Sequence, residues 1–495
     1  MKRVQILPIP IGLIAILLII DTAYIYPQCP PDLVFSSEIV ADGFGYKVSG
    51  VGDVNNDGFD DLIIGAYSND SGGTDAGRAY VYSGQSGNLL FTFTGEAAGD
   101  AFGVSVSGAG DVNNDGFDDL IVGAPLNAFA GLDAGRAYVY SGQDGSLLYT
   151  FTGEAAEDYL GSSVSSCGDV NNDGFDDFLI GSSRWENGRA YVYSGQSGTL
   201  IYTLISQESE DLFGRNVAGA GDVNNDGIDD FIIGANLDSN GGFRAGRAYI
   251  YSGLNGNLLY TFTGEAAGDQ FGFSVSEAGD VNNDSFDDLI VAAIFNDASG
   301  TNSGRVYVYS GIDGQLLHIF TGYARGDLLG WSVSGAGDMN KDGFDDIIVG
   351  APGQDAFGHR TGQAYVYSGQ SGDLLYTYTG EEAEDAFGVS VSNGGDMNDD
   401  GINDLIVGAH TRSRGGSQPG WVYVFYGREW LCGDANGDSL VTFDDVNYLI
   451  DFYFHSGSVP FSFISSDLNC DGSVDITDIL FLARYLNGGE EPCCL

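Results

Sequence analysis

Basic residues are scarce in this 495-residue chain, which has 18 Lys and Arg against 70 Asp and Glu and a formal net charge of -52. This balance excludes a phosphate-binding surface for nucleic acid, and it would repel an anionic membrane. Strong acidity can accompany disorder, but 43% hydrophobic residues, including 28 Tyr and 30 Phe, supply enough apolar surface for a core. The acidic residues also recur at fixed intervals, so we expect an ordered protein whose charge is organised.

Cysteine and histidine are also rare. Six cysteines are too few for a disulfide scaffold of this length, and none has the CxxC spacing of a zinc or redox site. One bridge from Cys432 or Cys470 to the tail is compatible with export, and Cys167 is interpreted as a small core residue. The four His share no repeat position and no HExxH spacing, and no GxSxG motif occurs. The sequence therefore predicts a binding protein and not an enzyme.

Long apolar runs are missing, except for one at the N-terminus. Residues 1–28 contain two basic residues, then an apolar run from Ile6 to Ile20, which is the layout of a secretory signal peptide. As a helix this run would span roughly 22 Å, less than the ~30 Å hydrocarbon core, which favours a cleaved signal over a membrane anchor. No clean cleavage motif fixes where the signal ends. We expect a secreted protein, extracellular or associated with the cell surface.

A nine-residue segment, DVNNDGFDD or a close variant, recurs seven times. Its copies begin at Asp53, Asp111, Asp169, Asp222, Asp280, Asp338 and Asp396, at intervals of 58, 58, 53, 58, 58 and 58 residues. Four short runs rich in β-branched and aromatic residues surround each copy, which is typical of strands. In the second copy these runs are 102–107, 120–124, 136–140 and 147–151. Because the connections are too short for crossover helices, each repeat should form an antiparallel four-stranded sheet.

Seven such units are enough to close a β-propeller, and the strand count indicates how the ring closes. The fourth run follows the first six units but is missing after Tyr426, whereas an unpaired run at 33–35 precedes the first unit. We expect this N-terminal strand to complete the last blade and remove the open sheet edges. The predicted fold is an all-β seven-bladed propeller of four-stranded antiparallel blades over 33–428, followed by a small α-helical calcium module over 432–489.

Each nine-residue segment has the side-chain oxygens of a calcium loop. Asp, Asn, Asp and Asp occupy positions 1, 3, 5 and 9, Gly at position 6 permits a sharp turn, and the position 7 carbonyl can add an oxygen. Mg²⁺ fits less well because it prefers to keep several waters. Metal-free Asx turns are the alternative, but several carboxylates on one short loop repel each other without a cation. Ser285 replaces the turn Gly in the fifth loop, which would weaken that site. The predicted Ca²⁺ ligands are Asp53, Asn55, Asp57, Asp61, Asp111, Asn113, Asp115, Asp119, Asp169, Asn171, Asp173, Asp177, Asp222, Asn224, Asp226, Asp230, Asp280, Asn282, Asp284, Asp288, Asp338, Asn340, Asp342, Asp346, Asp396, Asn398, Asp400 and Asp404.

Two further acidic loops follow Trp430, each with an amphipathic helical run behind it, at 446–454 and 479–487. Their spacing is similar to that of an EF-hand, although the last ligand is Asp instead of Glu and no entering helix is evident. The first loop lacks the turn Gly and a ligand at position 9, so the second is the better site. The predicted ligands are Asp434, Asn436, Asp438 and Asp445 in the first loop, and Asp467, Asn469, Asp471, Asp475 and Asp478 in the second.

Two short motifs identify a family resemblance for the repeats. Phe-Gly occurs at Phe44, Phe102, Phe213, Phe271 and Phe387, with Leu-Gly at Leu160 and Leu329, and Gly-Ala-Pro occurs at Gly123 and Gly350. This pairing resembles the FG-GAP repeat of integrin alpha-subunit propellers and of many exported bacterial proteins. The resemblance implies that the FG strand is innermost and that the calcium loop joins the first and second strands.

The loops between the second and third strands differ most among the seven units. In integrin-like propellers the equivalent loops lie on the face opposite calcium and contact ligands, which the resemblance therefore implies here. The alternative is that unconstrained surface loops simply vary. The candidate ligand-face residues are Phe129, Trp185, Phe243, Phe357, His359 and Arg412.

Two other sequence features have structural interpretations. Arg78, Arg136, Arg189, Arg247 and Arg305 occupy one place in the repeat, which predicts an ion pair between blades with a loop carboxylate. Arg325-Gly326-Asp327 matches an integrin-recognition tripeptide, but it aligns with Ala98-Gly99-Asp100 of the first repeat, so chance substitution explains it.

The duplicated loop-helix pattern of the tail is similar to a dockerin, which implies docking onto a cohesin domain of another protein. Positions 10 and 11 of each dockerin loop contact the partner, and here these are Phe443, Asp444, Ile476 and Thr477. The alternative is an intramolecular cap on the propeller. The leading hypothesis is a secreted calcium-binding adhesion or recognition propeller with an extracellular protein or glycan as its ligand. Since dockerins often accompany carbohydrate-active enzymes, a polysaccharide-degrading enzyme or accessory subunit is the second hypothesis.

Overall fold

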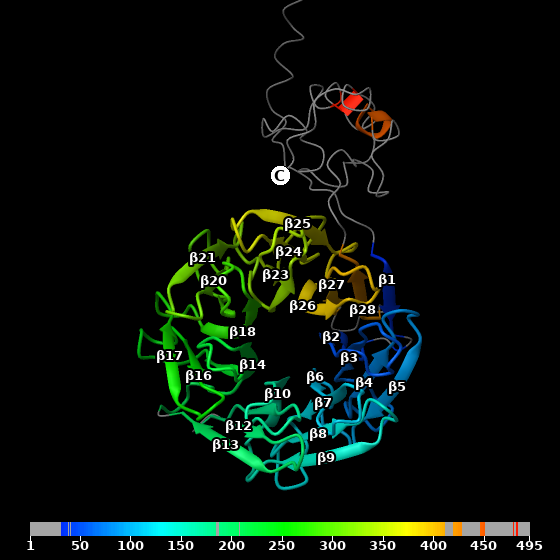
Figure 1. The fold of residues 1–495 in the computed structure, drawn as a ribbon, viewed down its shortest axis with the longest axis vertical. Helices are drawn as coiled ribbons and strands as arrows, with labels where there is room; N and C mark the ends of the chain where they lie inside the picture. Colours follow the sequence, from blue (N-terminus) through cyan, green and yellow to red (C-terminus); the bar gives the residue numbers. More distant parts are fainter. Residues whose placement is uncertain are drawn as a thin grey trace, which may run out of the picture. The chain divides into compact units, whose positions relative to one another are not determined.

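A computed structural model describes residues 31–37, 39, 41–184, 188–206, 208–410, 419–427, 446–450, 479 and 482–483. The chain divides into two compact units, one spanning Gln28–Trp430 and one formed by Met1–Pro27 with Leu431–Leu495. The first unit contains seven sheets of four antiparallel strands each. The predicted seven-bladed propeller is therefore confirmed (Figure 1).

The strands of the seven blades follow one another along the chain. They are β1 (Leu33–Ser36), β2 (Phe44–Gly50), β3 (Leu62–Ala66), β4 (Arg78–Tyr82), β5 (Leu89–Thr94), β6 (Ser105–Gly110), β7 (Asp119–Ala124), β8 (Arg136–Tyr140), β9 (Leu147–Thr152), β10 (Leu160–Ser166), β11 (Phe178–Ser182), β12 (Arg189–Tyr193), β13 (Leu200–Ile205), β14 (Asn216–Gly221), β15 (Asp230–Ala235), β16 (Arg247–Tyr251), β17 (Leu258–Thr263), β18 (Phe271–Gly279), β19 (Asp288–Ala293), β20 (Arg305–Tyr309), β21 (Leu316–Thr321), β22 (Val333–Gly337), β23 (Asp346–Ala351), β24 (Gln363–Tyr367), β25 (Leu374–Thr379), β26 (Phe387–Gly395), β27 (Asp404–Ala409) and β28 (Trp421–Phe425).

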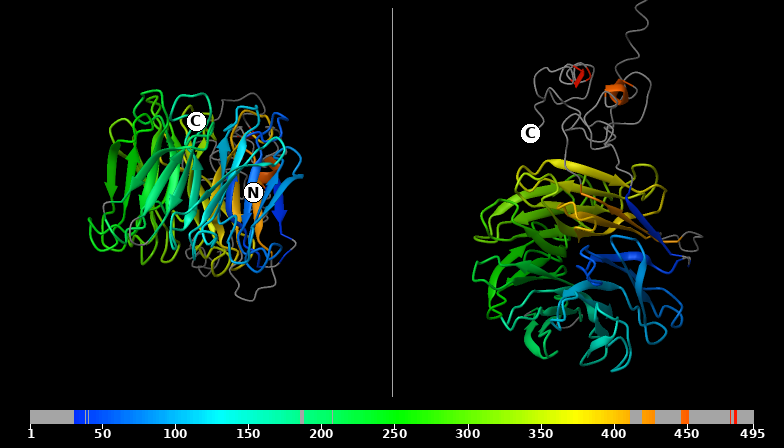
Figure 2. Two further views of the ribbon diagram at one scale, coloured as in Figure 1. Left: turned by 90° about the horizontal axis from the view of Figure 1, so that it is seen from below. Right: turned by 45° about the vertical axis from the view of Figure 1, so that its right-hand side comes forward.

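The first strand of each repeat is the innermost, as the family resemblance implied. Each of the first six blades runs in chain order from the axis outward, for example β2-β3-β4-β5. Figure 1 shows β2, β6, β10, β14, β18 and β26 around the centre of the ring. Seen edge-on, the strands run between the two faces of the propeller (Figure 2).

The last blade is completed by the N-terminal strand, so the predicted closure of the ring is confirmed. Its order is β1-β28-β27-β26, and Leu33 pairs with Val424 while Ser36 pairs with Trp421. The Phe35 ring lies 4.6 Å from that of Tyr82, which belongs to the first blade. The two ends of the propeller thus meet through backbone pairing and through a packed aromatic pair.

The two halves of the FG-GAP motif form a contact between neighbouring blades. A Cβ added to Gly123, on the second strand of one blade, would lie 2.0 Å from the carbonyl oxygen of Gly161 in the next blade. Gly408 of the last blade has the same relation to Gly45 of the first, at 2.2 Å. At these two contacts a side chain on Gly123 or Gly408 would collide with the neighbouring backbone, which favours glycine. These glycines therefore set how tightly the blades stack. The fifth blade departs from this pattern, because Ala292 holds the same position on β19 and lies against Gly330.

The core lies between the blades. The second strands are buried over their full length, as in β7, where all six residues are buried. Phe93 at the outer edge of the first blade stacks on Tyr140 of the second, with ring centroids 4.0 Å apart. Because each sheet is covered on both faces by its neighbours, no blade buries its apolar residues alone. Cys167 is buried at 2% exposure, which confirms its role as a small core residue.

Side-chain oxygens join the innermost strands of successive blades. Ser163 Oγ accepts a hydrogen bond from the Val217 backbone N–H at 3.2 Å. Ser332 Oγ accepts from Val391 N–H at 3.1 Å. Ser390 Oγ accepts from Val48 N–H of the first blade at 3.0 Å, across the closure of the ring.

Little of the second unit is described. Residues 446–450 are helical, with Val446 and Leu449 buried, and they fall within the helix expected at 446–454. A dockerin-like module is not shown by these residues. The signal peptide 1–28 and the tail sites predicted at Asp434, Asn436, Asp438, Phe443, Asp444, Asp445, Asp467, Asn469, Asp471, Asp475, Ile476, Thr477 and Asp478 lie outside the described residues. Across the part of the chain that the structure describes, no helix has the length and hydropathy of a membrane span.

Candidate functional site

The seven acidic loops lie between the first and second strands of their blades, where the family resemblance placed them. The first, 53–61, connects β2 to β3, and the second, 111–119, connects β6 to β7. Because every blade has the same orientation in the ring, all seven loops share one face of the propeller.

The carboxylate at position 1 of each loop is held by the backbone of the loop itself. In the second loop, Asp111 Oδ1 accepts from Asp115 N–H at 3.0 Å, and Asp111 Oδ2 accepts from Gly116 N–H at 2.8 Å. Asp115 Oδ1 accepts from Phe117 N–H at 3.1 Å. These bonds orient the side chains at positions 1 and 5 before any ion binds.

The carboxylate at position 9 anchors the loop to the body of the blade. Asp119 has no exposed surface; its Oδ2 accepts from Val112 N–H at 3.1 Å and its Oδ1 from Gly142 N–H at 2.9 Å. The amide nitrogen of Asn113 lies 3.1 Å from Asp119 Oδ2. Positions 3 and 9 therefore already face each other, and a half turn of the amide would present its oxygen instead.

The electrostatics of the loop favour a bound cation. Burial raises the pKa of Asp119 to about 7, and the charges of Asp115 and Asp111 add to the effect. The position 9 residue of the last loop, Asp404, reaches a pKa of about 8 for the same main reason. In the described ranges no three His, Cys, Asp or Glu side chains already form a metal cluster. The donor set of three carboxylates, one amide and one carbonyl nevertheless fits Ca²⁺, which would supply the missing positive charge.

The fifth loop keeps this arrangement although Ser285 replaces glycine. Ser285 adopts a φ of 71°, and its N–H donates to Asp280 Oδ2 at 2.8 Å, as glycine does in the other loops. A left-handed conformation is uncommon for serine and costs backbone strain. The expected weakening of this site would therefore come from strain and not from a lost hydrogen bond.

Sequence reasoning missed the role of the aspartate at position 8. Asp118 Oδ2 accepts from the Asp53 backbone N–H of the preceding loop at 2.9 Å. Asp60 makes the same bond to Asp396 N–H at 2.8 Å, which closes the series across the chain ends. The Asp-Asp doublet is thus divided: position 9 faces its own loop, and position 8 links the loop to its neighbour. The doublet itself, repeated in six of the seven copies, was the available signal.

In the calcium-free protein, we expect stability to fall as the pH rises from about 4 to about 7 or 8. Asp61 and Asp119 have a pKa of about 7 in the fold, whereas the ordinary value is 3.8. Over this interval the folded chain retains protons that the unfolded chain has released, so rising pH favours unfolding. Thermal melts in EGTA between about pH 5 and about pH 8 should show a falling melting temperature (Tm), and saturating Ca²⁺ should remove the fall. A Tm that rises over this range in EGTA would contradict the interpretation.

On the opposite face, three candidate ligand residues are strongly exposed. The exposed fractions are 76% for Phe129, 71% for Phe243 and 58% for Phe357, each between the second and third strands of its blade. The Arg136 guanidinium lies 3.7 Å from the Phe129 ring centroid. His359 is exposed, and its Nδ1 is 3.3 Å from Asp355 Oδ1. Trp185 and Arg412 lie outside the described residues.

The repeated arginines form the expected ion pairs between blades in three cases. Arg136 pairs with Glu96 of the preceding blade at 2.7 Å, and Arg305 pairs with Glu265 in the same way. Arg189 pairs with Glu154. For Arg247 the expectation is wrong, because its nearest carboxylate, 3.6 Å away, is Asp238 of its own blade. Arg78 donates to the Thr94 hydroxyl instead.

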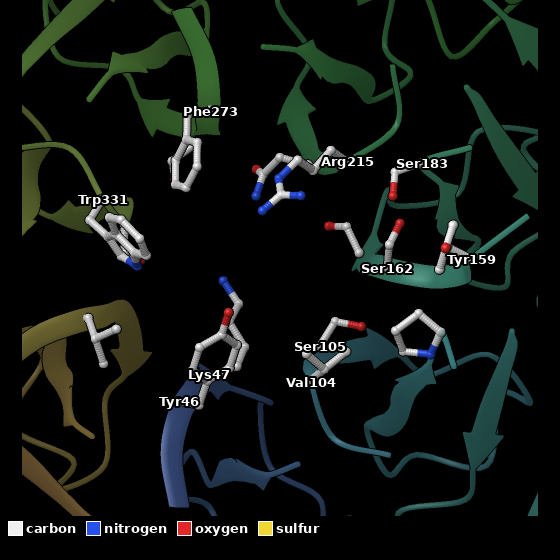
Figure 3. A pocket seen from close by; sticks show the side chains of 16 residues that line it. Tyr46, Lys47, Val104, Ser105, Tyr159, Ser162, Ser183, Arg215, Phe273 and Trp331 are labelled. Atoms are coloured by element: carbon white, nitrogen blue, oxygen red, sulfur yellow. The ribbon is translucent and has the colours of Figure 1, made fainter. Parts of the chain in front are cut away.

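A cavity of about 280 Å³ opens where the innermost strands begin, away from the acidic loops. Tyr46, Lys47, Arg215, Phe273 and Trp331 are among the side chains around it (Figure 3). A second cavity of about 460 Å³ lies where those strands end, and it is lined by carboxylates including Asp118, Asp176, Asp229 and Glu277. Burial raises the pKa of Glu277 to about 7. The first cavity has cationic and aromatic walls, and the second has acidic walls.

The repeats match the family model described as "FG-GAP repeat". The matched segments are residues 44–82, 102–140, 160–193, 213–251, 271–309 and 329–367, which correspond to the first three strands of the first six blades. The chain is 33% identical to integrin alpha-5 of Xenopus laevis over 211 residues, covering 39% of this chain and 20% of that protein. It is 31% identical to integrin alpha-V of Gallus gallus over 244 residues, covering 44% and 22% respectively. The match thus spans about a fifth of the length of these relatives.

Proposed function

Because six blades carry the FG-GAP repeat in an integrin-like propeller, we propose that this protein is a secreted calcium-binding adhesion or recognition module. The observation that carries the proposal is the acidic loop repeated in every blade, in which the charges at positions 1 and 5 add to burial in raising the pKa of the position 9 carboxylate, as Asp111 and Asp115 do for Asp119. Filled loops would make one face of the ring rigid. The opposite face would then be free to vary in sequence and to contact ligands.

The tail completes the proposal. The two loops at 434–445 and 467–478 have the spacing of calcium ligands, and we propose that they form a dockerin-like module that binds a cohesin-like domain of another protein. Phe443, Asp444, Ile476 and Thr477 would contact that partner. A calcium-dependent docking tail would place the propeller on a complex or surface, which suits a recognition role better than free diffusion.

The test is calcium-dependent capture of the full chain by immobilised cohesin-bearing proteins from the same source. We expect capture in Ca²⁺ and at least about tenfold less in EGTA, since the second tail loop must bind the ion to hold its shape. The double variant Asp467→Ala, Asp471→Ala should lose capture. The matched variant Asp111→Ala, Asp115→Ala, in a propeller loop, should keep it. Absence of capture in Ca²⁺, or capture indifferent to EGTA, would refute the docking role.

A further inference from the structure

The cavity at the start of the innermost strands is lined mainly by two consecutive positions of the repeat, together with Pro125, Tyr159 and Ser183. The first position, directly after Phe-Gly or Leu-Gly, holds Tyr46, Val104, Ser162, Arg215, Phe273, Trp331 and Val389 in blade order. The glycine, the strand and the acidic loop recur in every blade, but this position changes in almost every one. If the blade structure required a particular side chain at this position, that side chain would recur in every blade. Its variation indicates that the position has no structural role common to all blades.

The second position normally holds a residue that links neighbouring blades by a hydrogen bond. In six blades it is Ser or Asn, and in several of these its oxygen accepts a backbone N–H of the next blade, as Ser163 does from Val217 at 3.2 Å and Asn216 from Val275 at 3.1 Å. In the first blade this position is Lys47. An ammonium group has only donors and cannot accept such a bond. Lys47 therefore cannot form the hydrogen bond between blades that its counterparts form.

The cavity concentrates positive charge in a very acidic protein. Lys47 is one of only three lysines in the chain, and no Asp or Glu lines the cavity. Figure 3 shows Lys47 and Arg215 directed into the same space from opposite sides. Within the described residues neither forms an ion pair, and burial lowers the pKa of Lys47, so a bound anion would restore its charge.

The remaining walls offer flat apolar surfaces and a free hydroxyl. The rings of Phe273 and Trp331 are 5.2 Å apart, and the Arg215 guanidinium is 5.7 Å from the Phe273 centroid. Ser162 Oγ is buried and has no hydrogen-bond partner within the described residues. A buried hydroxyl without a partner is costly unless a ligand or water completes it.

We propose that this cavity binds an acidic sugar, with its carboxylate between Lys47 and Arg215 and its ring against Phe273 and Trp331. The inference rests on the proposed recognition function and names the class of its ligand. The volume of about 280 Å³ lies near the lower limit of small-molecule pockets, which suits one sugar ring better than a folded protein surface. The net charge of -52 disfavours a polyanion, so a ligand with a single carboxylate is expected.

The experiment compares D-glucuronate with D-glucose, titrated by calorimetry against the calcium-loaded full chain. We expect glucuronate to bind at least about tenfold more tightly, because only its carboxylate can pair with both cations. Lys47→Ser and Arg215→Val introduce the residues found in the second blade, Ser105 and Val104, so the fold should tolerate them. Each should weaken glucuronate about tenfold while leaving Tm nearly unchanged. Arg325→Ala, which removes an exposed arginine elsewhere, should leave binding unaffected.

Equal affinity for the two sugars, or unchanged binding by Lys47→Ser and Arg215→Val, would overturn the proposal. So would binding of an aspartate-containing peptide without glucuronate, since it would assign the cavity to an acidic protein segment. If glucuronate fails to bind a chain that still takes up calcium and is captured by cohesin-bearing proteins, only the ligand inference fails. If the chain takes up no calcium, the proposed function fails on its own evidence.

Discussion

Removal of calcium should lower the melting temperature of the propeller by more than about 10 °C. An ion present at 100 times its dissociation constant adds about 2.7 kcal/mol to folding, and seven loops contribute in this way. The loss should spread from loop to loop, because at five junctions of the ring the position 8 aspartate bonds to the neighbouring loop, as Asp118 does to Asp53 N–H. Without the ion, the carboxylates at positions 1 and 5 repel the buried carboxylate at position 9, as Asp111 and Asp115 do for Asp119, whose pKa is raised to about 7.

The measurement is a thermal melt of the full chain in Ca²⁺, in Mg²⁺ and in EGTA, combined with equilibrium calcium binding. Mg²⁺ should restore little of the lost stability, because it dehydrates reluctantly and rarely uses an all-protein cage. A melt in EGTA with added NaCl is the control, because salt screens exposed charges of any kind. It separates specific calcium binding from screening of the net charge of -52. A Tm unchanged by EGTA, or fully restored by NaCl alone, would disprove the calcium interpretation.

Regular spacing in the sequence was sufficient to predict the ring, its seven blades and its closing strand. Recurrence at 58 residues defines a unit, and the missing fourth strand after Tyr426 leaves only one partner for the run at 33–35. Spacing does not, however, predict whether a given side chain bonds within its own blade or to the neighbouring blade. Asp118 and Asp119 are adjacent in sequence, yet one bonds to a loop 65 residues away and the other to its own loop. That division depends on how the blades stack, which a single repeat does not encode.

The cationic cavity was missed for a related reason. Lys47 and Arg215 lie in different blades, 168 positions apart, and neither stands out when its own repeat is read alone. Only closure of the ring brings them around one axis. The candidate ligand residues were predicted in the variable loops between the second and third strands, and these loops do expose Phe129, Phe243 and Phe357. None of these three lines the cavity. Variation at one position of the innermost strands across the aligned blades, and not variation of the loops, indicates the cavity.

Phe35→Ala should destabilise the propeller by about 3–5 kcal/mol, the usual cost of removing a buried phenylalanine. Phe35 is 7% exposed, and it packs on Tyr82 of the first blade at 4.6 Å. It belongs to β1, a strand of only four residues that holds the two ends of the ring together. Its loss should release β1 and expose the edge of β28, so that the N-terminal segment becomes sensitive to protease before the remainder unfolds.

Two matched variants distinguish the effect of opening the ring from the effect of losing a buried side chain elsewhere in the core. Phe93 occupies the same place in the first blade and stacks on Tyr140 at 4.0 Å, but its strand is covalently continuous with that blade. Phe93→Ala should therefore cost a similar free energy without early proteolysis near the N-terminus. Val34, on the same strand as Phe35 but 47% exposed, should tolerate alanine with a loss below about 1 kcal/mol. Urea unfolding in saturating Ca²⁺ gives the free energies, and limited proteolysis reports the strand. The same cleavage pattern for Phe35→Ala and Phe93→Ala would contradict the prediction, because it would mean that β1 is released no more easily than a strand within a continuous blade.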